Sequence, residues 1–313
     1  MRRWRWSRVA VAWSMVSTVI VMTACNEKQG LLPKSGGRLY EVLVVGDTDD
    51  IVRNVLEADV EGLPQHEPEF DVSSIDSSQF KATLKLARNL VTVSINPDLY
   101  TTTRIRYEKN VYAQPQMVIH ISAPSRKSLR EDLNAQGKSL LTLLKRAETN
   151  ATLLQLEHQR NAKAERTIQE KFGHSLWIPM DMLSTKEGKD FVWLSNNSPT
   201  GMQNIVVYRS RTAKSTHEFV ANRDSVMRKN IKGETDAMHM KTVLKTVRRV
   251  KIKEKGREIT IYRGLWEMEG DEMGGPFVSH SIGDLTVEAF VFAPGMKKRN
   301  KLRQIEAALY TLK

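Results

Sequence analysis

The chain has 313 residues, of which 40% are hydrophobic and 27% charged, and it contains one cysteine. This composition suits one large or two modest globular domains, and it excludes an intrinsically disordered chain and a disulfide-stabilised miniprotein. The formal net charge is +12, from 48 Lys and Arg against 36 Asp and Glu, which suits an anionic partner without naming one.

The first 25 residues have the pattern of a bacterial lipoprotein signal peptide. Four arginines precede a 16-residue apolar run, Val9–Ala24, which is shorter than the roughly 20 residues that span a bilayer. The run ends in Val-Met-Thr-Ala-Cys, which resembles a lipobox. We therefore expect cleavage between Ala24 and Cys25 and a diacylglycerol on the Cys25 sulfur, whose acyl chains, such as palmitate, would hold the mature chain on a membrane.

The residues after the apolar run are polar and contain helix breakers. Residues 25–39 include Pro33, Gly36 and Gly37, which predicts a flexible tether after the lipidated cysteine. Because Cys25 is the only cysteine, a disulfide within one molecule is impossible.

The next segments predict a first α/β half over residues 40–148. An apolar run, Tyr40–Asp47, predicts a buried strand, and the acidic residues that follow it precede helical spacing from Ile51. We favour a helix cap here over a phosphate or calcium loop, because no glycine-rich fingerprint, P-loop lysine or EF-hand completes the motif. Further strands and a helix are predicted at Asn89–Ile95, Gln116–Pro124 and Ser128–Arg146.

The second half, residues 174–313, repeats part of this order. The strand-like run 287–292, an Ala-Pro pair and a helical pattern from Leu302 to Leu312 resemble the strand, Ala-Pro and helix at 117–146. This recurrence indicates an internal duplication that gives two similar sheet-plus-helix halves of α/β (α+β) class. A connecting helix is predicted over 149–173, and the wider spacing of strands in the second half indicates an insertion at 215–283.

The insertion contains a strongly basic segment. Residues 241–263 hold nine Lys and Arg against two Asp and Glu. Spacing over 241–250 predicts a basic amphipathic helix, followed by a hairpin with a turn at 254–256. The predicted surface for an anion or a protein partner consists of Lys241, Lys245, Arg248, Arg249, Lys251, Lys253, Lys255 and Arg257. The alternative is a solvated helix face and an edge strand protected by lysine.

A glycine-rich segment at 270–284 is the second candidate site. It contains Ser, His and Asp close together, but a hydrolase relay takes these residues from positions remote in sequence. A loop leading into a strand is the favoured interpretation, with a possible ligand contact through Gly274, Gly275, Pro276, Ser279 and His280. A hydrolase acting on envelope polymers, with its cleft here, remains the alternative function.

No other motif indicates catalysis, a metal or a cofactor. The seven histidines show no H-E-x-x-H and no close pairing, so neither a metal nor a catalytic set is predicted. Trp177, Trp193 and Trp266 are expected in the core or at its rim, although a sugar-stacking role would look similar. Nucleic acid is disfavoured, since the basic segment lacks interleaved aromatic residues.

Several segments together resemble a known family. The lipobox, Gly-Gly-Arg-Leu-Tyr-Glu-Val-Leu-Val-Val-Gly at 36–46, Gly-Gly-Pro-Phe-Val-Ser at 274–279 and the Phe-Ala-Pro at 292–294 resemble a Bacteroidota lipoprotein family catalogued as domain of unknown function 4837. The resemblance implies a lipid-anchored protein of the cell envelope. It implies no activity, catalytic residue or cofactor. The outer membrane, on its periplasmic side, is the expected location.

These observations favour a binding or scaffolding protein over an enzyme. Its expected partners are the membrane, through the lipid anchor, and an anionic envelope component or a protein that meets the basic surface. Removing residues 1–24 removes four arginines and no acid, which leaves 44 basic against 36 acidic residues.

Overall fold

A computed structural model describes residues 31–313 except Asp236 and Lys255, and it leaves the side chain of Glu254 undescribed. The predicted signal peptide, its cleavage site after Ala24 and the lipidated Cys25 lie outside the described residues. Residues 33–313 form one compact unit, and the descriptions below concern that unit. None of the helices in the described part of the chain is long and apolar enough to cross a membrane.

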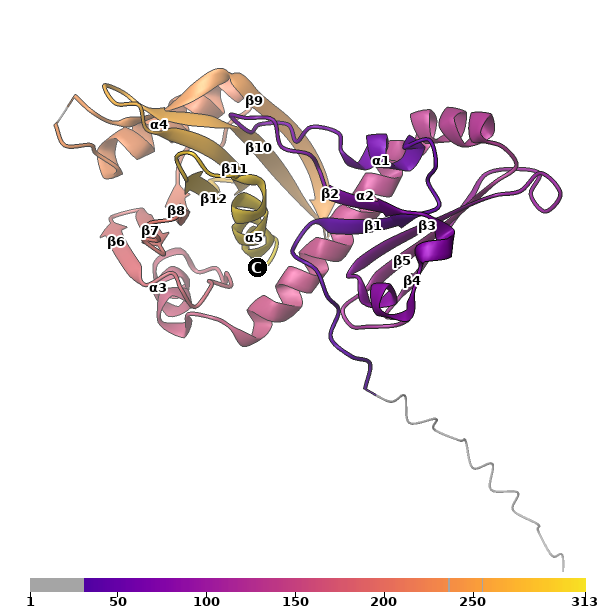
Figure 1. Cartoon of the computed structure of the whole chain (residues 1–313). Helices are drawn as coiled ribbons and strands as arrows, with labels where there is room; N and C mark the ends of the chain where they lie inside the picture. Colours follow the sequence, from indigo (N-terminus) through magenta and orange to yellow (C-terminus); the bar gives the residue numbers. More distant parts are fainter. Residues whose placement is uncertain (1–30, 236, 255) are drawn as a thin grey trace, which may run out of the picture. The chain divides into compact units, whose positions relative to one another are not determined.

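The first half contains a five-stranded sheet (Figure 1). Its strand order is β2-β1-β3-β5-β4, with β4 antiparallel and the other four strands parallel. The elements are β1 (Glu41–Val45), α1 (Ile51–Leu56), β2 (Asp71–Ile75), η1 (Ser77–Gln79), η2 (Ala82–Leu86), β3 (Asn89–Ile95), β4 (Arg104–Lys109), β5 (Met117–Ala123) and α2 (Arg126–His158).

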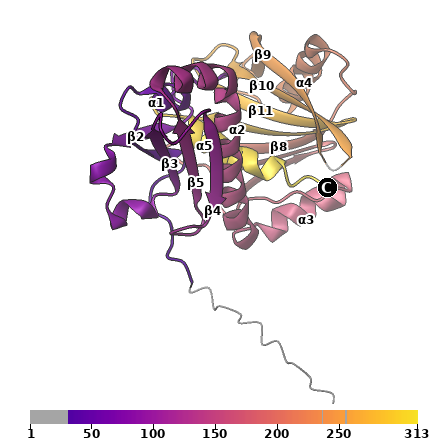
Figure 2. The same ribbon diagram turned by 90° about the vertical axis from the view of Figure 1, so that its right-hand side faces the viewer.

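Both faces of this sheet are covered, as expected for parallel strands with continuous apolar sequences. Helices α1 and α2 pack on one face (Figure 2), and the segment through η1 and η2 packs on the other. The predicted acidic cap of α1 is confirmed at Asp47, whose carboxylate accepts from the backbone N–H groups of Ile51, Val52 and Arg53 at 2.9–3.0 Å. This satisfies donors that the first helical turn leaves unpaired.

The second half contains a seven-stranded antiparallel sheet of order β6-β7-β8-β12-β11-β10-β9. Helix α4 packs on one face, and α3, α5 and the end of α2 pack on the other (Figure 1). The elements are α3 (Ala162–Phe172), β6 (Ser184–Gly188), β7 (Phe191–Ser195), β8 (Met202–Arg209), α4 (Thr216–Asn230), β9 (Met240–Glu254), β10 (Arg257–Met268), β11 (Gly274–Ile282), β12 (Leu285–Phe292) and α5 (Arg299–Leu309).

The predicted class, a mixed α and β protein with two sheets and helices, is confirmed. The predicted strand, Ala-Pro and helix unit occurs in both halves, as β5 with α2 and β12 with α5. The recurrence is limited to that unit, because the first sheet is mainly parallel and the second wholly antiparallel. The predicted insertion 215–283 supplies three of the seven strands, so it is an integral part of the sheet.

Three local expectations are corrected by the structure. The helix predicted over 241–250 is wrong, since these residues belong to β9, an edge strand paired with β10. The single connecting helix predicted over 149–173 is instead the end of α2 and the separate helix α3, whose N-cap is Asn161. Residues 33–36, predicted to belong to a flexible tether, are hydrogen-bonded to the first half at Gln114, Leu86 and Arg88.

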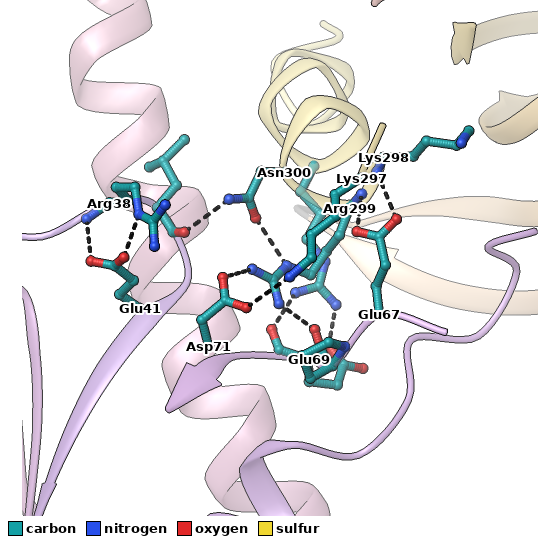
Figure 3. Close-up of polar contacts among 12 residues, drawn as sticks. Arg38, Glu41, Glu67, Glu69, Asp71, Lys297, Lys298, Arg299 and Asn300 are labelled. Atoms are coloured by element: carbon teal, nitrogen blue, oxygen red, sulfur yellow. Dashed lines mark hydrogen bonds and ion pairs between the residues drawn. The ribbon is translucent and has the colours of Figure 1, made fainter. Parts of the chain in front are cut away.

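Carboxylates just before and at the start of β2 hold the start of α5 (Figure 3). Glu67 is buried and accepts from the backbone N–H groups of Lys298 and Arg299 at 2.6 and 2.9 Å. The Arg299 guanidinium donates to Asp71 at 2.6 Å, and Arg303 pairs with Glu69. A negative charge at a helix N-terminus is favourable, so these contacts join α5 of the second half to the first half.

Candidate anion-binding pocket

The sequence around α4 leaves one end of the second sheet uncovered. Helix α4 begins after Ser215, whose hydroxyl accepts from the Glu218 N–H at 3.1 Å, while the Lys214 N–H donates to the Glu218 carboxylate at 2.7 Å. This arrangement resembles a capping box, with the Glu218 carboxylate accepting from the residue before the N-cap, and it fixes where the helix starts. The loop 210–214 leads from β8 to this helix and lies beside residues of β9, β10, β11 and β12.

A cavity of about 330 Å³ lies at that place. It is bounded by the loop 210–214, the first turns of α4 and residues of β9, β10, β11 and β12. Its charged lining residues are Arg211, Lys214, Arg249, Lys251 and Glu258. Its hydroxyl-bearing lining residues are Ser210, Thr212, Thr260, Tyr262, Ser281 and Thr286. The charged lining thus holds four cations against one carboxylate.

Arg249 is the central cation of the cavity. Its Nη1 donates to the Lys214 carbonyl at 3.0 Å, and its guanidinium lies 6.0 Å from the centre of the Tyr262 ring. Its Nε is buried and has no hydrogen-bond partner among the residues that the structure describes. A buried donor without an acceptor is costly. An anion in the cavity would supply the missing hydrogen-bond acceptor.

The other lining groups differ in how far their charge is neutralised. Lys251 donates to Glu258 at 2.6 Å, whereas no ion pair of Arg211 or Lys214 is found in the described part of the chain. Burial raises the pKa of Tyr262, although the charge of Arg249 acts in the opposite direction. The Tyr262 hydroxyl therefore stays neutral and can both donate to and accept from an oxyanion.

The predicted basic surface is divided by the structure. Arg249 and Lys251 line the cavity. Lys241 is paired with Glu267 and Glu269, and Arg257 donates to the Leu312 carbonyl at 3.0 Å. Three further members, Lys245, Arg248 and Lys253, are exposed and lie outside the cavity. Lys255 lies outside the described residues.

The predicted ligand loop is a strand. Gly274, Gly275, Pro276, Ser279 and His280 all lie in β11, between β10 and β12. A Cβ atom on Gly275 would lie 2.0 Å from the Val291 carbonyl oxygen. The glycine is therefore required by the close approach of neighbouring backbone, which explains its presence without a ligand.

Ser279 and His280 point to opposite faces of the sheet. Ser279 donates to Glu288 at 2.7 Å under α4, whereas His280 packs edge to face on Tyr310 behind α5. Burial lowers the pKa of His280 to about 4, so the ring is neutral and closed to a substrate. Asp284 is instead exposed and pairs with Arg209 at 2.7 Å. The three side chains form no relay, so this segment gives the hydrolase hypothesis no support.

Glu306, whose charge acts on the pKa of His280, also has a structural role. Burial opposes ionisation of Glu306, yet the Arg263 guanidinium lowers its pKa to about 2. Arg263 Nη1 donates to Glu306 at 2.9 Å, which fixes α5 on the sheet. No group of three or more His, Cys, Asp or Glu side chains that could hold a metal occurs among the residues described.

Sequence reasoning did not identify Arg211 and Lys214 as members of the site. A signal was present, since both precede the N-cap of α4 in the stretch Arg-Thr-Ala-Lys-Ser. Cations next to a helix N-terminus oppose the helix dipole. Their position there is a reason to look for an anion.

Comparisons with known proteins give families without assigned functions. Residues 161–311 match the family model described as Domain of unknown function (DUF4837), and residues 35–157 match the one described as Domain of unknown function (DUF8532). The resemblance to the first family is thus confirmed over the second half only, and the motif at 36–46 falls within the other match. The gap between the matches, residues 158–160, coincides with the junction of α2 and α3.

One solved structure shows a partial similarity. A crystal structure of a protein from Bacteroides thetaiotaomicron VPI-5482 aligns at 14% identity over 45% of this chain and 44% of that chain, with a TM-score of 0.20. The alignment therefore spans less than half of either protein. No functionally curated protein shows significant sequence similarity to the chain.

Proposed function

We propose that this chain is a binding protein that takes a phosphate- or sulfate-like anionic group into the cavity at the start of α4. The observation that carries the proposal is the composition of that cavity, in which four cations and six hydroxyl-bearing residues converge on about 330 Å³. Arginine and lysine are the side chains that recognise such oxyanions, and hydroxyls complete the hydrogen bonding. The volume suits a small anionic solute or the end of an anionic polymer.

We further propose that the protein works in a bacterial cell envelope, held by acyl chains on Cys25 at the periplasmic side of the outer membrane. The support for this is the complete lipobox and the basic, apolar segment before it. Two or three acyl chains on one residue would give essentially permanent attachment. The ligand would then be an anionic component of the envelope. Binding requires no chemical step.

The binding proposal is tested by removing cations inside and outside the cavity. The triple variant Arg211→Gln, Lys214→Gln, Arg249→Gln is expected to bind inorganic phosphate and glucose 6-phosphate at least about tenfold more weakly, measured by titration calorimetry. Loss of one hydrogen bond to a charged group costs about 1.5–3 kcal/mol, and about 1.4 kcal/mol is a factor of ten in affinity. Glucose, which lacks the anion, should not bind this site.

The matched control is the triple variant Lys245→Gln, Arg248→Gln, Lys253→Gln. It removes the same net charge from exposed positions of β9, so it reproduces any long-range effect of charge while leaving the cavity intact. Its affinity for phosphate should stay within about twofold of the parent chain. Equal losses of phosphate affinity in both variants would indicate binding to a diffuse basic surface and not to the cavity. No loss in either variant would show that the cavity is not the binding site.

The anchoring proposal has a direct chemical test. Cells grown with radiolabelled palmitate should label the parent chain but not Cys25→Ala, because the cysteine sulfur is the only predicted acceptor of the lipid. Met22→Leu keeps an aliphatic residue three positions before the cysteine and should label normally. Equal incorporation into the parent chain and Cys25→Ala would refute the anchor.

A further inference from the structure

A second cavity, larger than the first, lies where the two halves of the unit meet. Its volume is about 620 Å³, and it is bounded by the C-terminal half of α2, the start of β5 and the segments around Trp177 and Tyr310. This size falls within the range of sites that hold small organic ligands. The predicted anion surface does not contribute to it.

The walls of this cavity are largely apolar. They include Met117, Ala151, Leu153, Leu154 and Trp177. Leu154 is 55% exposed although it lies on a helix that packs in both hydrophobic cores. An exposed leucine at the rim of an apolar cavity is a surface that an apolar ligand would cover. Trp177, for which sugar stacking was an alternative, lies on the same wall, with its ring under the Arg160 guanidinium.

Arg88 provides the polar end of the cavity. Its side chain is only 17% exposed and forms an ion pair with Glu148, but its buried Nε has no hydrogen-bond partner among the described residues. The nearest carboxylate oxygen, Glu148 Oε1, lies 3.9 Å from Arg88 Nε, which is beyond hydrogen-bond distance. A guanidinium has five N–H donors, so a mostly enclosed one whose Nε has no acceptor is suited to an anionic group.

Glu148 does not replace that missing acceptor. Its Oε1 already accepts from the Asn89 side-chain amide at 2.5 Å. Burial raises the pKa of Glu148, against the opposing effects of Asn89 and Arg88. The exposed lysines Lys109 and Lys313 also line the cavity, against one further carboxylate, that of the exposed Glu157. The polar end therefore favours a negatively charged head group.

We propose that this cavity binds a single-chain amphiphile, with the apolar chain along the wall of α2 and Trp177 and an anionic head group on Arg88. The ligand class is that of a fatty acid. A neutral sugar would use the aromatic wall but would offer the buried Arg88 Nε no charged hydrogen-bond acceptor. The proposal is independent of the anion-binding pocket, because the two cavities share no lining residue.

The test is a fluorescence titration of the full chain carrying Cys25→Ala, with dansylated undecanoic acid as the probe. Ala151→Phe places a ring in the cavity and should weaken probe binding at least tenfold. Ala135→Phe puts the same ring on an exposed position of the same helix, and it should bind within twofold of the parent. Equal binding by both variants would overturn the proposal.

Two further comparisons distinguish loss of the cavity from misfolding and identify the class of ligand. Leu154→Glu should weaken probe binding, whereas Leu183→Glu, at an exposed leucine that lines neither cavity, should not. Undecanoic acid should displace the probe at least tenfold better than undecanol, because only the acid offers Arg88 an anion. Equal displacement by the alcohol, or displacement by maltose, would overturn the assignment of an anionic amphiphile.

Discussion

Replacing Glu288 with glutamine is expected to destabilise the protein by roughly 3–5 kcal/mol, the largest effect among the polar substitutions considered. Glu288 and Arg223 are both fully buried between α4 and the second sheet. Arg223 Nη2 and Nε donate to the Glu288 carboxylate at 2.7 and 2.9 Å. The variant would leave the buried guanidinium with the more distant, partly exposed Asp224 carboxylate, 3.7 Å from Nη1, in place of its direct partner, which is the costly way to break such a pair.

Further contacts hold the Arg223 guanidinium in its buried position. Arg223 Nη1 donates to the Thr242 hydroxyl at 2.9 Å, and the guanidinium lies 4.2 Å above the Phe277 ring. Burial opposes its charge, but Glu288 raises the pKa of Arg223 above its ordinary value, so the side chain stays protonated. Relief would require moving α4 away from the sheet.

Urea unfolding followed by tryptophan fluorescence measures the effect, with Asp284→Asn as the matched control. Asp284 pairs with Arg209 at 2.7 Å on the surface, where such pairs contribute about 0–1 kcal/mol. The double variant Arg223→Met, Glu288→Met should be more stable than Glu288→Gln, since no charge remains buried. A Glu288→Gln protein as stable as Asp284→Asn would contradict the assignment of a buried, tightly coupled pair.

Gly275→Ala is expected to cost about 3 kcal/mol or more, at or beyond the usual cost of overpacking a core. The new methyl group would lie 2.0 Å from the Val291 carbonyl oxygen and 3.3 Å from Trp266 Nε1. The first contact is with backbone of β12, a strand paired on both sides. The collision cannot be relieved by rotating a side chain, so two central strands must separate.

Two other glycines provide a graded comparison by thermal unfolding. Gly274→Ala would bring Cβ to 2.9 Å from the Trp266 carbonyl oxygen, whereas Gly36→Ala would bring it no closer than 3.9 Å to Leu86. The expected order of melting temperatures is Gly36→Ala above Gly274→Ala above Gly275→Ala. Gly36→Ala should be neutral or stabilising by up to about 1 kcal/mol. An unchanged melting temperature for Gly275→Ala would show that the sheet does not need this close approach.

Local patterns predicted β1, α1, β3, β5 and much of α2 in the first half, but not β2 or β4. The apolar run Asn89–Ile95 is β3 with the same ends, and Asp47 caps the helix that the acidic cluster indicated. These features depend on residues close in sequence, where apolar runs and capping groups have few alternative structures. Strand pairing partners and the parallel or antiparallel character of each sheet depend on distant residues, so the sequence left them open.

The error at β9 has an identifiable cause. Val243, Leu244, Val247 and Val250 have spacings of three and four that fit a helix face. In the structure, Val243 pairs with Leu265 and Arg248 pairs with Arg263, so residues 244–247 of β9 lie opposite Gly264 alone. This irregularity breaks the two-residue alternation of the strand. The alternation was the signal that would have distinguished the strand from a helix.

The sequence indicated only some residues of the candidate sites, because the others come from distant parts of the chain. The basic composition of 241–257 indicated Arg249 and Lys251 but not which basic residues face a cavity and which are paired with carboxylates. Arg211 and Lys214 reach the pocket from the loop before α4. Arg88 and Glu148 are 60 positions apart in the sequence, and their proximity follows only from the packing of α2 on the first sheet.

The two segments that match separate families are not independent bodies in this protein. Leu156 of α2 packs in the core of the second half, while Arg303 of α5 lies 4.6 Å above the ring of Tyr40 in the first. Each segment thus completes the packing of the other, and neither can unfold without exposing apolar surface in both. By thermodynamic linkage, a ligand that occupies either cavity raises the free energy of unfolding of the whole unit. A ligand bound in either cavity is therefore expected to stabilise both halves of the unit against unfolding.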